Sequence, residues 1–269
     1  MFITRGPAII LADYHLPNNH IAYNLLRWAW VSVFGDGLLG QRLLSVGFTG
    51  AAGAGVLVAA RTLGGRSAGV AGLFFFCTSH TVVVLAGQAR GYAVTFALVA
   101  WAFVSLVRWV TEERRRMPWG YVFLGGLALG VSPGNVFTLA AIASWAMLST
   151  VRGKSFTAAR WQWLVRAPWL VAPLGFGAVF YLGKGGDLRR VAEIGAAETS
   201  NVLSTFLGIF VYDAWALPLL LLAALCSRSS ALGSKDACLI VGLVAIVMTA
   251  GLTIANPPGR VFAPMLVLL

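Results

Sequence analysis

The sequence predicts an all-α protein: a polytopic transmembrane helical bundle of about eight spans, with one additional juxtamembrane helix. Of the 269 residues, 59% are hydrophobic and 11% are charged, and the mean hydropathy is +0.82. A soluble domain carries about 25% charged residues, so this chain has more apolar surface than it can bury against itself. The apolar residues also fall into runs close to the ~20 residues that cross a bilayer.

The apolar runs extend through most of the chain and predict one transmembrane domain over residues 1–269. Within it we expect an outer loop and juxtamembrane helix at 1–42 and the helical bundle at 43–269. The last apolar run begins at Val261 and stops at Leu269, which predicts a bundle truncated at its C-terminus. The net charge of +11 does not indicate nucleic acid, because the basic residues lie between apolar runs as orientation determinants.

The predicted juxtamembrane helix covers residues 19–34, after a loop at 1–18. Asn18 or Asn19 suits its N-cap, and Gly35 suits its C-terminal end. Its polar side chains fall on one face, at His20, Asn24 and Arg27. The helix is short for a span, and its Trp and Arg residues are typical of a membrane–water interface. We therefore expect it to lie on the outer membrane surface.

The remaining runs predict the spans and their orientation. The expected spans are 43–60, 70–87, 92–109, 119–131, 136–151, 163–182, 204–226 and 237–255, where the fourth and fifth are alternatively one broken segment. Basic loops alternate with less charged ones, and the positive-inside rule makes the basic loops cytoplasmic. The loops then expected on the outer side are 1–42, 87–91, 132–135, 183–203 and 256–260.

Cations and polar side chains that suit a ligand gather on the outer side. Arg42 opens the first span, His80 lies within the second span toward its outer end, and Gln88, Arg90 and Arg260 lie in outer loops. Carboxylates are few among them, so this face suits an anionic, membrane-embedded ligand such as a lipid phosphate. The three cysteines have no metal-ligand spacing, and Asp13, His15 and His20 match known ligand spacings poorly. No metal site is predicted, and a need for a divalent metal or another cofactor stays open.

Three short segments stand out as a set: Pro17-Asn18-Asn19-His20 with Tyr23, Leu25 and Leu26; Phe34-Gly35-Asp36 with Gln41-Arg42-Leu43-Leu44-Ser45; and Gly87-Gln88-Ala89-Arg90-Gly91-Tyr92. Together they resemble the integral membrane glycosyltransferases of the C superfamily. A later Gly259-Arg260-Val261-Phe262 segment adds to the set. The resemblance is to the branch that contains protein O-mannosyltransferases and the bacterial aminoarabinose transferases of lipid A.

The resemblance implies transfer of a sugar from a polyprenyl-phosphate-linked donor to an acceptor lipid, glycan or protein on the non-cytoplasmic face. An outer-loop carboxylate then acts as the base, and an outer Arg stabilises the departing phosphate. The implied catalytic residue is Asp13. The implied donor-phosphate ligands are Arg90, Arg260, Arg42 and His20, and the implied acceptor-binding or cavity-lining residues are Tyr92, Gln88, His80 and Asn19.

Each of these roles has an alternative. Asp13 is otherwise a solvated loop residue, and Arg90 an interfacial side chain that reaches the headgroups. His20 otherwise stabilises its loop by hydrogen bonds, and His80 otherwise satisfies its bonds inside the bundle. For the whole chain, the alternatives are a transporter or flippase of a lipid-linked sugar, and a non-catalytic fragment that lacks the family's first span and acidic pair. In each case the expected location is the bilayer of a bacterial plasma membrane, with the active side non-cytoplasmic.

Overall fold

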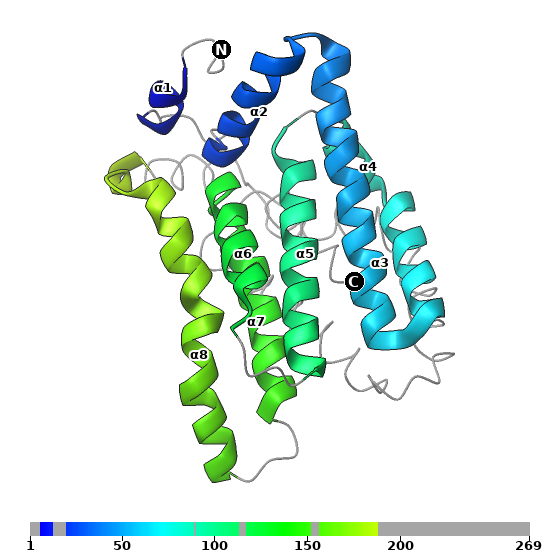
Figure 1. The fold of residues 1–269 in the computed structure, drawn as a ribbon, viewed down its shortest axis with the longest axis vertical. Coiled ribbons are helices and arrows are strands. Elements are labelled where there is room, and N and C mark those ends of the chain that lie inside the picture. The colour runs from blue at the N-terminus through cyan, green and yellow to red at the C-terminus, as the bar shows by residue number, and fades with distance from the viewer. Residues whose placement is uncertain (1–5, 13–19, 89, 113–116, 152–155, 188–269) are drawn as a thin grey trace, which may run out of the picture.

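The computed structural model describes residues 6–12, 20–88, 90–112, 117–151 and 156–187, and all regular structure in them is helical. The prediction of an α-helical fold is therefore confirmed for this part of the chain. The helices are α1 Pro7–Ala12, α2 Ile21–Phe34, α3 Leu38–Thr78, α4 His80–Gly87, α5 Tyr92–Thr111, α6 Trp119–Val131, α7 Asn135–Val151 and α8 Phe156–Ala178, followed by the 3₁₀ turn η2 Val179–Tyr181 (Figure 1).

α5 is the central helix of the bundle. In its most apolar 18-residue stretch 72% of the residues are buried, against 17% in the corresponding stretch of α8 at the periphery. Its buried side chains contribute to all three clusters of the hydrophobic core, which also involve α2, α3, α4, α6, α7 and α8. The other helices therefore pack around α5.

α3 is a helical hairpin, because the chain reverses at Gly65, whose φ of 83° suits only glycine. The two arms touch through small residues. A Cβ placed on Gly69 would lie 3.0 Å from the Cβ of Arg61, and one on Gly72 would lie 3.2 Å from the Cβ of Ala60. Small residues bring helices close in lipid, where a bulky side chain would separate them. The predicted break between the first two spans is thus a tight reversal.

Three local predictions are wrong. The loop expected at 1–18 contains α1, and α2 begins after His20, so neither Asn18 nor Asn19 is its N-cap. The span expected at 70–87 is interrupted at Ser79, which has extended backbone angles. The Ser79 hydroxyl accepts a hydrogen bond from the Val82 N–H at 3.3 Å and so starts α4 as a new helix.

α6 and α8 pack closely, because glycines of one helix face bulky side chains of the other. A Cβ on Gly126 would overlap the Phe176 ring, and one on Gly130 would lie 2.6 Å from the Phe180 ring. On the α8 side, a Cβ on Gly177 would lie 2.6 Å from Leu129. The backbones therefore approach to a distance that only glycine allows.

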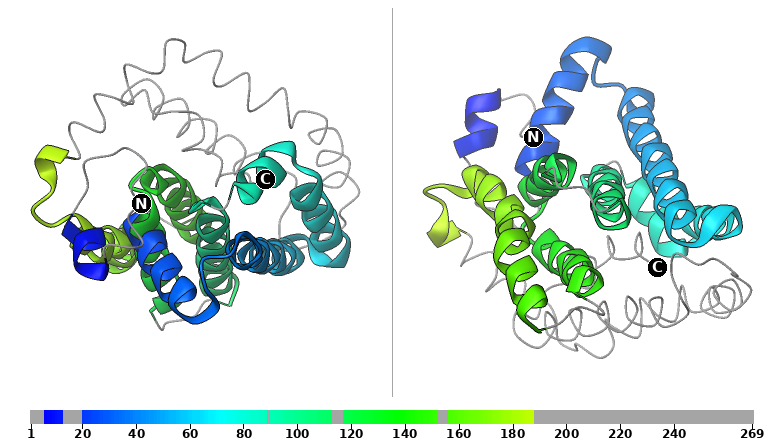
Figure 2. Two further views of the ribbon diagram at one scale, coloured as in Figure 1. Left: turned by 90° about the horizontal axis from the view of Figure 1, so that it is seen from above. Right: turned by 60° about the horizontal axis from the view of Figure 1, so that its bottom comes forward.

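The predicted alternation of loops is visible in the fold. Figure 1 places α2, the beginning of α5, the α6–α7 turn and η2 at one end of the bundle, which we call the α2 end. The reversal of α3, the end of α5 and the beginnings of α6 and α8 lie at the opposite end, and Figure 2 agrees. Within the described residues, the helix ends that border the expected outer loops thus lie apart from those that border the basic loops expected inside.

Within the described residues, three helices are long and apolar enough to cross a bilayer: α3, α5 and the stretch Leu164–Tyr181. α6 and α7 are shorter apolar helices. The expected spans at 204–226 and 237–255 lie outside the described residues. The predicted number of about eight spans is therefore not confirmed.

The α6–α8 contact predicts an unequal response to added methyl groups. We expect Gly126→Ala to lower the free energy of unfolding by about 1–3 kcal/mol, because the new methyl group overlaps Phe176. Gly47→Ala in α3 is the matched control: a Cβ there meets nothing within 4 Å, so it should be neutral or stabilise by up to about 1 kcal/mol. Unfolding by SDS in mixed micelles measures both, and equal effects would contradict the packing described.

Candidate functional site

The C-terminal end of α6 is the point where the elements of the α2 end meet. The last four carbonyls of a helix have no partner within it, and burial makes unpaired carbonyls costly. Asn135, at the start of α7, donates from Nδ2 to the Ala128 oxygen at 2.6 Å and is buried. Tyr181, in η2, donates its hydroxyl proton to the Leu129 oxygen at 2.8 Å. Two elements after α6 thus cap its last turn.

The third cap comes from a residue far earlier in the chain. His20, just before α2, places Nδ1 2.8 Å from the Val131 oxygen. A carbonyl only accepts, so Nδ1 carries the proton in this contact, and Nε2 of the neutral ring is then the acceptor. This bond attaches the N-terminus of α2 to the last residue of α6. His20 therefore makes a structural hydrogen bond, and its predicted role as a donor-phosphate ligand stays a prediction.

The Arg90–Tyr92 turn lies against the same histidine. The Tyr92 ring meets the His20 ring edge to face, with ring centroids 5.8 Å apart. Gly91 lets this turn approach α2 and the end of α6 closely: a Cβ there would lie 2.8 Å from Val131 Cγ1 and 3.2 Å from His20 Cγ. We call the following residues the α6 junction: His20, Gly91, Tyr92, Val131, Asn135 and Tyr181.

Two α2 side chains beside the junction, Tyr23 and Arg27, differ in their chemistry. Burial raises the pKa of Tyr23, and the nearby Arg27 guanidinium offsets this only in part. Tyr23 is therefore a neutral phenol near pH 7 and no base. Arg27 donates from Nη2 to Gln41 Oε1, and Gln41 donates from Nε2 to Asp36 Oδ1. This chain of bonds links two opposite charges through one amide and fixes the corner between α2 and α3.

A further contact at the α2 end involves Lys184, which follows η2. Its Nζ donates to the Leu11 oxygen of α1 and to the Phe180 oxygen at 3.3 Å. Burial lowers the pKa of Lys184, and the Asp187 carboxylate offsets part of that effect. Lys184 therefore ties the first described helix to the end of the last one.

The structure brings some predicted site residues together and leaves others apart. His20 and Tyr92 are in contact, and Arg90 and Gln88 are exposed in the adjoining turn. Arg42 near the start of α3 and His80 at the start of α4 are also exposed, and neither takes part in the junction contacts given above. The predicted residues Asp13, Asn19 and Arg260 lie outside the described residues.

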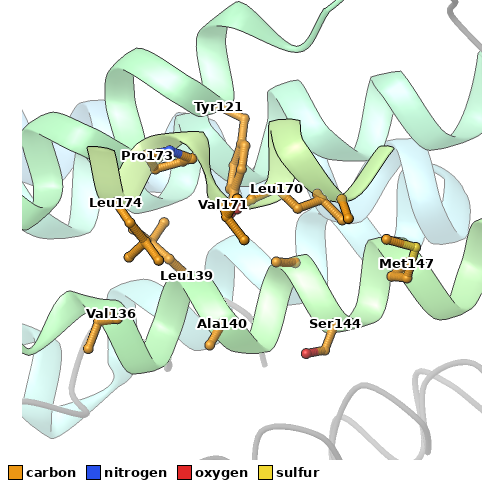
Figure 3. A pocket seen from close by; sticks show the side chains of 12 residues that line it. Tyr121, Val136, Leu139, Ala140, Ser144, Met147, Leu170, Val171, Pro173 and Leu174 are labelled. Carbon is orange, nitrogen blue, oxygen red and sulfur yellow. The ribbon is translucent and has the colours of Figure 1, made fainter. Parts of the chain in front are cut away.

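An apolar cavity of about 270 Å³ lies between α6, α7 and α8. Its lining includes Leu139, Leu170 and Leu174, with the Ser144 hydroxyl on the α7 side (Figure 3). The Tyr121 hydroxyl donates to the Leu170 oxygen at 3.0 Å beside it. The cavity has no charged lining residue and suits hydrocarbon.

Sequence reasoning missed Tyr181 and the Gln41 bonds, because their partners leave no local signature.

In the described part of the chain, no group of three or more His, Cys, Asp or Glu side chains is placed to hold a metal ion. Comparisons with protein-family models, curated proteins and solved structures found no match for this chain.

The His20 bond predicts a local loss on truncation. His20→Ala should lower the free energy of unfolding by about 1–3 kcal/mol, because the Val131 carbonyl loses its donor inside the bundle. Amide exchange should accelerate in α2 and in the last turn of α6. Arg66→Ala, at the opposite end of the bundle, is the control, since Arg66 is exposed and its loss should cost about 0.5 kcal/mol or less. Unchanged exchange in α2 after His20→Ala would contradict the assignment.

Proposed function

We propose that the chain acts as a membrane glycosyltransferase that moves a sugar from a polyprenyl-phosphate-linked donor to an acceptor on the non-cytoplasmic face. The observation that carries the proposal is the contact of His20 with Gly91 and Tyr92. These residues belong to two of the segments on which the resemblance to the C-superfamily glycosyltransferases rests. Segments about 70 residues apart in the sequence thus meet at one end of the bundle, as parts of a single site would.

Arg90 supplies the charge that such a site needs. It is exposed two residues before the first residue of α5. The N-terminus of a helix carries a partial positive charge, which the guanidinium adds to. A phosphate at this position is favoured in the ground state, and more strongly as negative charge develops on it while the sugar leaves.

The other roles follow the chemistry of transfer. Asp13 removes the proton from the acceptor hydroxyl, whose oxygen then bonds to the sugar carbon as the bond to the donor phosphate breaks. Arg42 and Arg260 are further phosphate ligands in this proposal, and Gln88, His80, Asn19 and Tyr92 line the acceptor side. His20 acts through the junction by holding α2 and the Arg90–Tyr92 turn in place.

Replacing Arg90 tests the phosphate role. Arg90→Ala should lower kcat by about 10²–10³-fold in a sugar-transfer assay with the full chain in nanodiscs and a polyprenyl-phosphate-linked sugar. Arg108→Ala is the matched control, because Arg108 is an exposed arginine at the opposite end of the same helix. Equal activity in the two variants would remove Arg90 from the site, and absence of transfer by the unmodified chain would overturn the proposed function.

Replacing Asp13 tests the base. Asp13→Asn should lower kcat by about 10²–10⁴-fold, with little change in the KM for the donor, because the amide cannot accept the acceptor's proton. Asp187→Asn neutralises a carboxylate that follows η2 and should retain activity. If Asp13→Asn transfers sugar at the rate of the unmodified chain, the base is another group.

A further inference from the structure

Three of the helices carry uncharged stretches with a cation at each end. In α3 no charged residue lies between Arg42 and Arg61, and in α5 none lies between Arg90 and Arg108. In α8 the uncharged stretch extends from Arg166 to Lys184. Each of these stretches extends from one end of the bundle to the other; those of α3 and α5 start at the α2 end, and that of α8 starts at the opposite end (Figure 1).

The length of these stretches matches the hydrocarbon of a bilayer. Arg42 and Arg61 are 19 residues apart in the continuous first arm of α3. At 1.5 Å per residue this separation is about 28 Å, close to the ~30 Å of a hydrocarbon core. Arg90 and Arg108 are 18 residues apart, which corresponds to about 27 Å.

One hydrogen bond shows that the arginine pair of α3 and the arginine pair of α5 lie at similar heights along the bundle. The Trp101 indole of α5 donates to the Ala51 oxygen of α3 at 2.9 Å. Ala51 follows Arg42 by nine residues, and Trp101 follows Arg90 by eleven. The two helices run in the same direction, so the difference of two residues offsets the two arginines by only about 3 Å.

A contact at the opposite end brings α8 into the same register. The Arg166 guanidinium lies 4.5 Å from the centre of the Trp109 ring, which directly follows Arg108. Arg166 is therefore level with Arg108. A Trp next to an Arg at this height is also typical of the interface between hydrocarbon and headgroups.

The arginines face outward among apolar side chains. Arg42, Arg61, Arg90 and Arg108 are all exposed. On α3, Arg42 shares its face with Leu39, Leu43 and Val46, which are 55–73% exposed. A face of this kind lies against lipid, and guanidinium groups at its two limits are placed for lipid phosphates, which they bind through two parallel hydrogen bonds.

We propose that Arg42 and Arg90 bind phospholipid headgroup phosphates of one leaflet, and that Arg61, Arg108 and Arg166 bind those of the other. The two levels are about 28 Å apart and fix the height of the bilayer on the fold. α2 and its corner with α3 then lie at or beyond the headgroups, with the α6 junction at headgroup level. The inference does not require sugar transfer, although Arg42 and Arg90 each have a part in both proposals.

Spin-label depth measurements in nanodiscs of phosphatidylcholine and phosphatidylglycerol test this inference. Nitroxides are attached, one at a time, to Leu39→Cys, Val46→Cys, Gly50→Cys and Ala54→Cys, in the full chain with Cys77, Cys226 and Cys238 replaced by Ser. All four labelled positions are exposed. Accessibility to oxygen should peak at positions 50 and 54, midway between the arginines, and accessibility to a water-soluble nickel complex should be highest at 39. A peak at 39 or 46 would overturn the proposal.

A second measurement isolates the role of the cations. In Arg42→Leu/Arg90→Leu the label at 39 should move toward the hydrocarbon by about one helical turn, roughly 5 Å, while Arg42→Lys/Arg90→Lys should leave its depth unchanged. The nanodiscs contain no polyprenyl phosphate, so any shift reports on bilayer phospholipid. In nanodiscs of a phosphate-free glycolipid the unmodified chain should show the depth of the leucine variant. Identical depths in all three chains would overturn the assignment of the phosphates.

Discussion

The fold depends on how the carbonyls at the end of α6 are satisfied. The last four carbonyls of a helix have no partner within the helix, and where the helix end is buried, as Val131 is here, the packing around it excludes solvent that could replace them. Here Asn135, Tyr181 and His20 provide side-chain donors from three different elements to oxygens of that last turn. Asn135 gives the Ala128 oxygen a second donor beside the Ser132 N–H at 3.0 Å, and the bonds from Tyr181 and His20 satisfy carbonyls that would otherwise be costly to bury. Each bond also fixes the position of the element that provides the donor. α2, α7 and the end of α8 thus have defined places relative to α6 because they share one turn of backbone.

Packing around α5 and α6 makes this turn accessible to those donors. Glycines on α6 admit Phe176 and Phe180, so the end of α8 comes near enough for the Tyr181 hydroxyl to reach Leu129. Gly91 has the same effect on the other side, where any side chain would push His20 and Val131 apart. The site proposed for sugar transfer lies at the same end, with Arg90 one residue from this contact. The junction at the α2 end is therefore held by hydrogen bonds to backbone, while Arg42 and Arg90 remain exposed.

The sequence predicted the helices better than the contacts between them. Apolar periodicity placed α5 and α6 within about two residues of their observed ends, and the loop charges correctly separated the two ends of the bundle. The break at Ser79 was missed because the run around it is uniformly apolar, and a serine in such a run does not reveal whether it caps a helix. His20 was recognised as important, but its partner is a carbonyl 111 residues away, and every residue carries a carbonyl. Tyr181 was missed for the same reason. All the catalytic and ligand-binding roles assigned from the sequence remain predictions, and Asp13, Asn19 and Arg260 lie outside the described residues.

Carbonyl chemical shifts measure the proposed organisation of the α6 end most directly. With ¹³C-labelled carbonyls at Leu129 and Val131, solid-state NMR of the chain in bilayers reports the hydrogen bonding of each oxygen separately. We predict that Tyr181→Phe moves the Leu129 signal upfield and leaves Val131 in place, because only the hydroxyl donor is lost. Replacing His20 with Phe should move the Val131 signal and leave Leu129 unchanged. If neither substitution changes its own carbonyl signal, the two side chains do not cap α6, and the account of how the α2 end is held together is wrong.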